Sequence, residues 1–344
     1  MSDPDLSPDT ETALRALGRA VYFLDRELAP SPKVRAFQRA ATVIAGLPGD
    51  ELIARVSDGT LVDLDGLGPS TARVVTEAFH DVDDGYLAQL EQRSLVEIGP
   101  GTDLREALRG DCHMHSTWSD GGAPIATMAA TARNLGHEYI VLTDHSARLT
   151  IAHGLDEGRL AEQLDEVRAL NDDLAPFRIL TGMEVDILED GALDLDEGML
   201  ADLDVVVASV HSKLRLPAAD MTKRMVTAVA SPHVDILGHC TNRKLTGRGR
   251  PPSDFDADYV FAACARFGTA VEINCRPERQ DPPDDLLALA LEWDCHVAID
   301  TDAHAPGQLE WQAYGCDKAA EVGVSADRVI NTWPAEQLLS WVGQ

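Results

Sequence analysis

The sequence predicts an α/β protein in which a parallel sheet or barrel follows a small all-helical domain. Apolar residues recur only at helical spacing from residue 10 to about 95. From about residue 105, short β-branched runs alternate with helical stretches, as in a parallel sheet whose strands are joined by helices. We therefore expect two domains, 1–95 and 105–344, with a linker within residues 85–101.

The first domain is predicted from two amphipathic helices followed by a glycine turn. The apolar positions are Leu14, Leu17, Val21 and Leu24, then Val34, Phe37, Ala41 and Ile44. Leu64-Asp65-Gly66-Leu67-Gly68 then lies between two helical runs, which is typical of a helix–hairpin–helix whose amides bind a DNA phosphate. Pro69 stands where such hairpins usually have a basic residue, so a packing or protein-contact role is equally expected.

The charge restricts the partners. The net charge is −29 and the pI is near 4.5, and residues 1–100 hold nine Lys and Arg against seventeen Asp and Glu. Affinity for nucleic acid depends mainly on Lys and Arg that meet phosphates, so binding of a long duplex along a broad basic face is disfavoured. A small phosphorylated substrate, or one DNA end held by metals, remains compatible with this charge.

The six cysteines include no CxxC pair. No basic segment followed by an apolar run predicts a signal peptide, and no run of about 18 apolar residues predicts a membrane span. We expect reduced thiols, a cytoplasmic location and no membrane contact.

Seven β-branched runs are predicted as strands, and polar side chains collect where they end. The runs are 111–115, 139–143, 178–185, 205–210, 234–238, 269–273 and 296–299. His113 and His115 are two apart on the first run, so both face the same way. The sixth run contributes Glu272 and Asn274. Because the C-terminal ends of barrel strands form active sites, this repeated polarity predicts a site there.

Nine of these polar residues are candidate metal ligands. They are His113, His115, Asp120, His145, Glu184, His211, His239, Asp302 and His304. Imidazole and carboxylate groups suit Zn²⁺, Mn²⁺ or Fe²⁺, and nine ligands are too many for one ion, so we expect two or three ions with a bridging carboxylate. Such a site produces hydroxide near neutral pH and holds a phosphoryl group, which predicts hydrolysis of a phosphate ester by a metal-bound hydroxide.

The same motifs resemble the polymerase and histidinol phosphatase (PHP) family over residues 105–330. They are His113-x-His115, Ser119-Asp120-Gly121, Thr143-Asp144-His145, Glu184, His211, Gly238-His239 and Asp302-x-His304. The resemblance implies a distorted seven-stranded (β/α) barrel with a trinuclear metal site. By position, the first ion is expected on His113, His115, Glu184 and Asp302, the second on Glu184, His211 and His239, and the third on Asp120, His145 and His304.

Within that family the sequence is similar to the C-terminal module of bacterial family X DNA polymerases. The similar stretches include Asp144-His145-Ser146, Val210-His211-Ser212 and Asp235-Ile236-Leu237-Gly238-His239, and the helical domain resembles that family's first domain. Residues 95–110 leave no room for the polymerase palm and thumb, so polymerase activity is not expected. Lys33 is the only lysine of the helical domain and lies outside the hairpin, which disfavours lyase activity there.

Basic and acidic residues beside the ligands are candidates for substrate contact. Arg243, Lys244, Arg248 and Arg250 follow His239 directly and are predicted to bind the substrate phosphate, together with Arg148. Lys213, Arg276 and Arg279 also follow strand ends and are weaker candidates. The predicted catalytic group comprises Arg243, His153 facing the substrate, and Asp111 and Asp144 orienting histidines.

Two substrate classes and two other functions remain open. The subfamily resemblance favours DNA 3′ ends, as a 3′–5′ exonuclease or 3′-phosphatase with the helical domain binding DNA. The acidity favours a small phosphomonoester such as histidinol phosphate or a nucleotide. A DNA-binding accessory protein with a relic barrel is disfavoured by the complete ligand set. An amidohydrolase-like barrel is disfavoured because no lysine stands at a strand end to be carboxylated.

Overall fold

The computed structural model describes residues 6–342 and divides the chain into two compact units. The first unit is Met1–Leu95 and the second is Val96–Gln344. Each unit has its own apolar core, so each is considered by itself.

The first unit is all-helical. Its elements are α1 (Pro8–Arg26), α2 (Ser31–Ala45), α3 (Gly49–Asp58), a 3₁₀ turn (Leu61–Asp63), α4 (Pro69–Phe79) and α5 (Tyr86–Arg93). Ser7 caps α1 by accepting a hydrogen bond from the amide of Thr10. Leu17, Phe37 and Ile44 are fully or almost fully buried in the core, at positions that the helical spacing predicts.

The glycine turn of this unit precedes α4. Gly66 has a φ of 96°, a conformation that glycine adopts without steric cost. Gly68 is the N-cap of α4, and its amide donates to the Thr71 hydroxyl at 2.9 Å. One amide of the turn is therefore used inside the protein.

The second unit is a barrel of parallel strands. The strands are β1 (Gly110–Met114), β2 (Tyr139–Leu142), β3 (Arg178–Asp186), β4 (Val205–Ser209), β5 (Ile236–Leu237), β6 (Ala270–Asn274) and β7 (Val297–Asp300). They pair in sequence order, and every pair is parallel. β7 returns beside β1, where a parallel bridge joins Met114 to Ala303 and the His115 amide donates to the Ala303 carbonyl at 2.8 Å. The prediction of a distorted seven-stranded barrel is confirmed.

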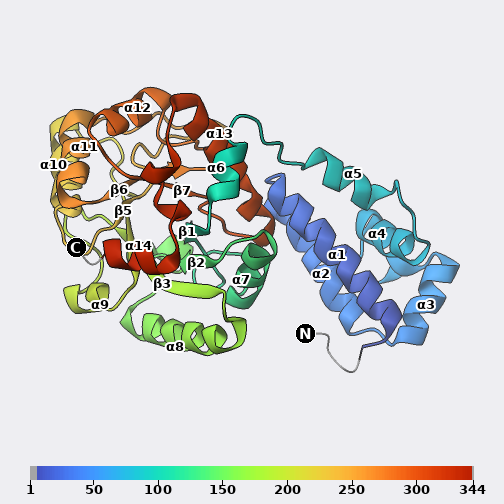
Figure 1. Ribbon diagram of the computed structural model, residues 1–344. Helices are drawn as coiled ribbons and strands as arrows, with labels where there is room; N and C mark the ends of the chain where they lie inside the picture. Colours follow the sequence, from blue (N-terminus) through green and yellow to red (C-terminus); the bar gives the residue numbers. More distant parts are fainter. Residues whose placement is uncertain (1–5, 343–344) are drawn as a thin grey trace. The chain divides into compact units, whose positions relative to one another are not determined.

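Helices cover the outside of this barrel (Figure 1). The main ones are α7 (Ile125–Asn134), α8 (Glu157–Leu174), α10 (Ala218–Val229), α11 (Ala257–Phe267), α12 (Asp284–Glu292) and α13 (Gln312–Val322). Shorter helices are α6 (Thr102–Ala107), α9 (Glu197–Ala201) and α14 (Ala335–Trp341). β1, β2, β4, β5, β6 and β7 are buried throughout, because a covered parallel sheet has no face toward water.

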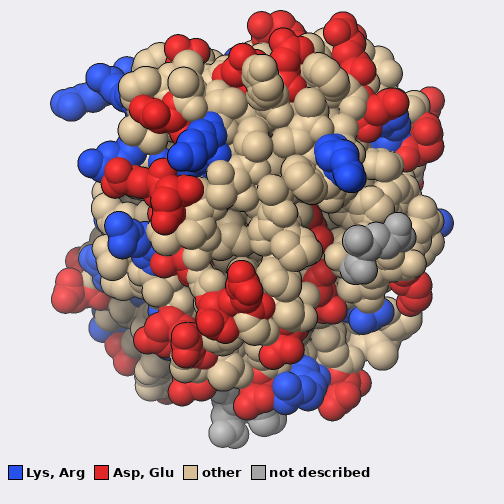
Figure 2. All heavy atoms as spheres, turned by 90° about the vertical axis from the view of Figure 1, so that its left-hand side faces the viewer, with Lys and Arg blue, Asp and Glu red and all other residues tan. Residues whose placement is uncertain are grey.

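The barrel departs from regular geometry at two places, β5 and the pairing of β1 with β2. β5 has two residues where five were predicted, and the pairing of β1 with β2 shifts register between Asp111 and Met114. All six cysteines are buried and unpaired within the described chain, as expected. None of the helices described is both long and apolar enough to cross a bilayer. Figure 2 shows one face, on which Asp and Glu side chains are widespread and Lys and Arg side chains lie singly or in small groups.

Candidate metal centre

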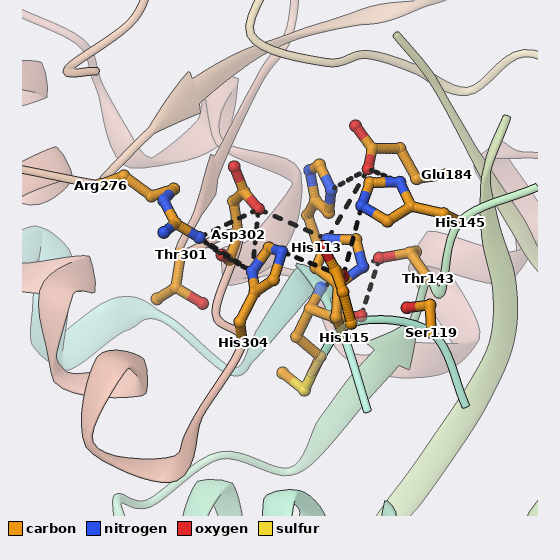
Figure 3. Close-up of polar contacts among 12 residues, drawn as sticks. His113, His115, Ser119, Thr143, His145, Glu184, Arg276, Thr301, Asp302 and His304 are labelled. Carbon is orange, nitrogen blue, oxygen red and sulfur yellow. Dashed lines mark hydrogen bonds and ion pairs between the residues drawn. The ribbon is translucent and has the colours of Figure 1, made fainter. Parts of the chain in front are cut away.

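The nine predicted ligands come together at the C-terminal end of the barrel. Parallel strands bring these ends to one edge, so side chains up to 191 positions apart become neighbours. His113 lies on β1 and Glu184 on β3, and the other seven lie in the segments that follow β1, β2, β4, β5 and β7. Figure 3 shows six of the nine directed toward one another.

Glu184 is the carboxylate that connects the histidines of this cluster, and Figure 3 shows it beside His145. Its Oε2 atom lies 2.8 Å from His145 Nδ1, 3.4 Å from His113 Nε2 and 3.6 Å from His115 Nε2. Its Oε1 atom lies 2.9 Å from His239 Nε2 and 3.2 Å from His211 Nε2. One buried carboxylate therefore faces five imidazoles.

Three sets of ligand atoms in the described chain each fit within 4.8 Å. The sets are His115, Asp120, His145 and His304; His113, His115 and Glu184; and His145, Glu184 and His211. Asp302 approaches His115 at 3.4 Å and so borders the first two sets. The family resemblance assigned His115 and His145 to one ion each, whereas here each of these residues belongs to two sets.

Unpaired polar atoms show that the cluster suits cations. His113 Nε2, both ring nitrogens of His115 and Glu184 Oε2 are buried and make no well-aligned hydrogen bond within the described chain, although His145 Nδ1 lies 2.8 Å from Glu184 Oε2. Buried nitrogen and oxygen atoms are normally paired, since an unpaired one costs about 1–3 kcal/mol. Divalent ions would engage these lone pairs, and the mixed imidazole and carboxylate donors are those that Zn²⁺, Mn²⁺ and Fe²⁺ accept. The residues present therefore fit a metal centre.

The electrostatics follow from crowding opposite charges in a buried space. Burial lowers the pKa of His211, but Glu184 and Asp186 outweigh this effect and raise it to about 9. Burial raises the pKa of Glu184, but the neighbouring histidines, His211 first, hold it well below its usual range. The pKa of His115 is well below its usual range because of burial and the charges of His304 and His145. A cation bound here would compete with protons for the ring nitrogens.

Two carboxylates that hold ligand histidines were not assigned a role by sequence reasoning. Glu272 on β6 lies 2.5 Å from His113 Nδ1 and accepts from the His239 amide at 2.5 Å. Asp186 at the end of β3 lies 3.2 Å from His211 Nδ1 and accepts from its amide at 3.1 Å. Strand alternation could have identified Asp186 from the sequence, because it places Asp186 on the same face of the strand as Glu184.

Asp111 and Asp144 lie beside the cluster and bind backbone and hydroxyl groups. Asp111 accepts from the Thr301 hydroxyl at 2.5 Å and from the His113 amide at 3.2 Å. Asp144 accepts from Ser116, Ser119 and Gln163 and thereby holds the turn that carries Asp120. Both carboxylates hold the segments that carry ligands, and their hydrogen bonds do not involve imidazole rings.

A basic recess of about 230 Å³ opens beside His304. It is lined by Arg243, Lys244, Arg250, Arg276, Glu278, Arg279 and His304. Three of the four cations predicted from the loop after His239 are therefore in it, together with two of the weaker candidates. Arg148, His153 and Arg248 are exposed and are not among its lining residues.

Two arginines connect the basic recess to the ligands. Arg276 Nη1 donates to the Asp302 carbonyl at 2.8 Å, and Arg279 Nε lies 3.5 Å from Asp302 Oδ2 (Figure 3 shows Arg276). His304 Nδ1 lies 2.9 Å from the same carbonyl and 2.8 Å from Arg276 Nη1, so the ring, the guanidinium and the carbonyl meet at one point. Burial raises the pKa of Asp302, but Arg276 and the histidines hold it well below its usual range.

Known proteins share this sequence pattern. The family model described as "PHP domain" matches residues 111–274. A probable phosphatase of Thermoanaerobacter sp. (strain X514) is 31% identical over 235 residues, which cover 64% of this chain and 89% of that protein. The chain belongs to the PHP family. The second unit is called the PHP unit below.

Other matches differ in extent. The DNA polymerase/3′-5′ exonuclease PolX of Bacillus subtilis (strain 168) is 40% identical over 237 residues, which cover 69% of this chain. The chain spans only 40% of the length of that relative. A histidinol phosphate phosphatase of Lactococcus lactis, crystallised with zinc, L-histidinol and phosphate, is 18% identical, with a TM-score of 0.45 over 63% of this chain and 94% of that one.

Proposed function

We propose that this PHP protein is a metal-dependent phosphoesterase that removes a terminal phosphoryl or nucleotidyl group. The observation that carries the proposal is the basic recess of Arg and Lys side chains beside a cluster in which Glu184 faces five imidazoles. Phosphoryl transfer requires cationic groups around the phosphoryl oxygens and a positioned nucleophile, and the two features supply these side by side.

The three ligand sets would hold two or three divalent ions, with Zn²⁺, Mn²⁺ or Fe²⁺ as candidates. Bound ions would supply Lewis acidity toward the phosphoryl oxygens and lower the pKa of water. The protein's own part is positional. Glu272 and Asp186 orient His113 and His211, and Arg276 and Arg279 place positive charge between Asp302 and the recess.

Two substrates are supported by different observations. The identity with PolX of B. subtilis supports DNA 3′ ends, as a 3′–5′ exonuclease or 3′-phosphatase. The relatives described as probable phosphatases and the net charge of −29 support a small phosphomonoester. The Gly68 amide is engaged by Thr71, which weakens the case for phosphate binding at the glycine turn.

The test compares turnover by the protein reconstituted with Mn²⁺ or Zn²⁺. The substrates are a 3′-recessed DNA, a 3′-phosphorylated DNA and a panel of small phosphomonoesters at matched salt. His113→Ala should abolish metal binding and turnover, whereas His233→Ala, outside the ligand sets, should change neither. Full activity in metal-free His113→Ala would overturn the proposal, and the preferred substrate would decide between the two candidates.

A further inference from the structure

Glu278 is the one carboxylate that lines the basic recess. The other lining side chains are five cations and His304. A carboxylate among cations that bind phosphate opposes that binding, because it repels the same negative charge that the arginines attract. Its position therefore needs a reason other than anion binding.

One of its two oxygens is used and the other is not. Glu278 Oε1 accepts from Arg276 Nε and lies 3.0 Å from Arg276 Nη2. Among the described residues Oε2 has no hydrogen-bond partner, although the side chain is only 7% exposed. The backbone is fixed as well, because the Glu278 carbonyl accepts from the Leu245 amide at 2.7 Å. Positioning of Arg276 accounts for Oε1 and leaves Oε2 unexplained.

A buried carboxylate oxygen without a partner is costly, so a ligand that donates a hydrogen bond to it is favoured over one that does not. We propose that Glu278 Oε2 accepts a hydrogen bond from a donor on the substrate next to its phosphoryl phosphorus. This inference rests on the proposed phosphoesterase function. The donor is either a proton on the phosphoryl group or a hydroxyl on the carbon chain beside the ester. An ionised ester with neither donor leaves Oε2 buried and unpaired.

The test is Glu278→Gln in the full, metal-loaded chain, with the exposed Glu292→Gln as matched control. The Gln oxygen can keep the bond to Arg276, which puts an amide NH₂ donor at the position of Oε2 in place of an acceptor. Glycerol phosphate carries a hydroxyl beside the ester, and p-nitrophenyl phosphate carries none. Both are assayed at pH 5.5 and pH 8, on either side of the second phosphate pKa of about 6.

The expected result is a KM for the donor-bearing substrate that rises about tenfold or more relative to wild type, as for loss of a hydrogen bond to a charged group. A hydroxyl donor gives this rise with glycerol phosphate at both pH values. A phosphoryl proton gives it with both substrates at pH 5.5 only. With p-nitrophenyl phosphate at pH 8, KM should stay level or fall, because a negative charge has been removed.

An equal rise in KM on both substrates at both pH values would assign Glu278 to positioning Arg276 alone and overturn the inference. An equal fall in KM on both substrates at both pH values would show that Glu278 only repels the substrate, which would also overturn the inference. If wild type hydrolyses no ester, the proposed function fails. Calorimetry with inorganic phosphate then still tests the inference, because wild type should prefer the protonated anion and Glu278→Gln the dianion.

Discussion

Single carboxylates determine how the histidine rings of the centre are presented. Glu272 is fully buried and lies 2.5 Å from His113 Nδ1, so an Nδ1 proton directed at Glu272 leaves His113 Nε2 toward Glu184. Partners of this kind orient metal-bound histidines and raise their basicity.

Glu272→Gln is therefore expected to weaken metal binding by about 10- to 100-fold, the usual cost of losing such a partner. The neutral amide can still accept a hydrogen bond from His113 Nδ1. Without the negative charge, however, it stabilises the tautomer with a proton on Nδ1 less strongly. Metal titration followed by calorimetry measures the change, and the exposed Glu321→Gln serves as control. Unchanged affinity in Glu272→Gln would show that His113 is oriented by packing instead.

The loop between β2 and α8 depends on a glycine. A Cβ on Gly154 would collide with the carbonyl of Ser146, which follows the ligand His145. The Ser146 hydroxyl accepts from the Asp186 amide at 3.0 Å, so a displaced Ser146 disturbs the partner of His211 as well.

Gly154→Ala is expected to lower the unfolding free energy by about 1–3 kcal/mol, as overpacking usually does, and to weaken metal binding. Gly158→Ala in α8 is the matched control, because its nearest neighbour would be an Asp156 oxygen at 3.5 Å. Urea unfolding and metal titration measure the two effects. Equal behaviour of the two variants would contradict the role given to this loop.

Asp235, the residue before β5, is a buried acid outside the ligand sets. Burial raises the pKa of Asp235 to about 8, although its carboxylate accepts from the Val206 amide at 2.8 Å. Between pH 3.8 and about 8 the folded protein holds a proton here that the unfolded chain has lost. Stability from this group is therefore present below that window and is lost as the pH rises through it.

Asp235→Asn is expected to remove a slope of about 1.4 kcal/mol per pH unit from the unfolding free energy within this window. The amide oxygen retains the bond to Val206 and carries no charge. Urea unfolding from pH 4 to pH 9 measures the slope, with the exposed Asp254→Asn as control. An identical slope in wild type and Asp235→Asn would mean that Asp235 is ionised in the folded protein.

At the scale of the whole molecule, the two units should respond differently to metals. Every ligand set in the described chain lies in the PHP unit. Ions that bind only the folded state stabilise it by about 2.7 kcal/mol at a hundred times Kd, which shifts the Tm of a unit this size by roughly 5–10 °C.

A chelator should therefore lower the Tm of the PHP unit and leave the transition of the helical unit unchanged. Scanning calorimetry of the full chain with and without metal resolves this. The first unit provides the internal control, because its core has no part in the ligand sets. Equal shifts of both unfolding transitions would contradict this prediction. They would mean that metals also bind outside the barrel end, or that the two units unfold together.

Much of the barrel was predictable because its signals are local. β-branched runs placed the seven strands within a few residues, and strand alternation put His113 and His115 on one face. The family motifs named the nine candidate ligands in order, and their metal-binding role remains a prediction. β5 was predicted too long, because a β-branched run does not show where pairing stops.

By itself, the sequence determined the α/β fold class, the positions of the strands along the chain and the chemical nature of the site, since these depend on spacing along the chain. Only the tertiary structure decided which carboxylate faces five histidines, that Glu272 and Asp186 hold two of the rings, and that Arg276 and Arg279 line the recess while Arg148 and Arg248 do not. The physical reason is that these relations depend on the register between strands and on the path of each loop. Both are set by packing between segments far apart in the chain.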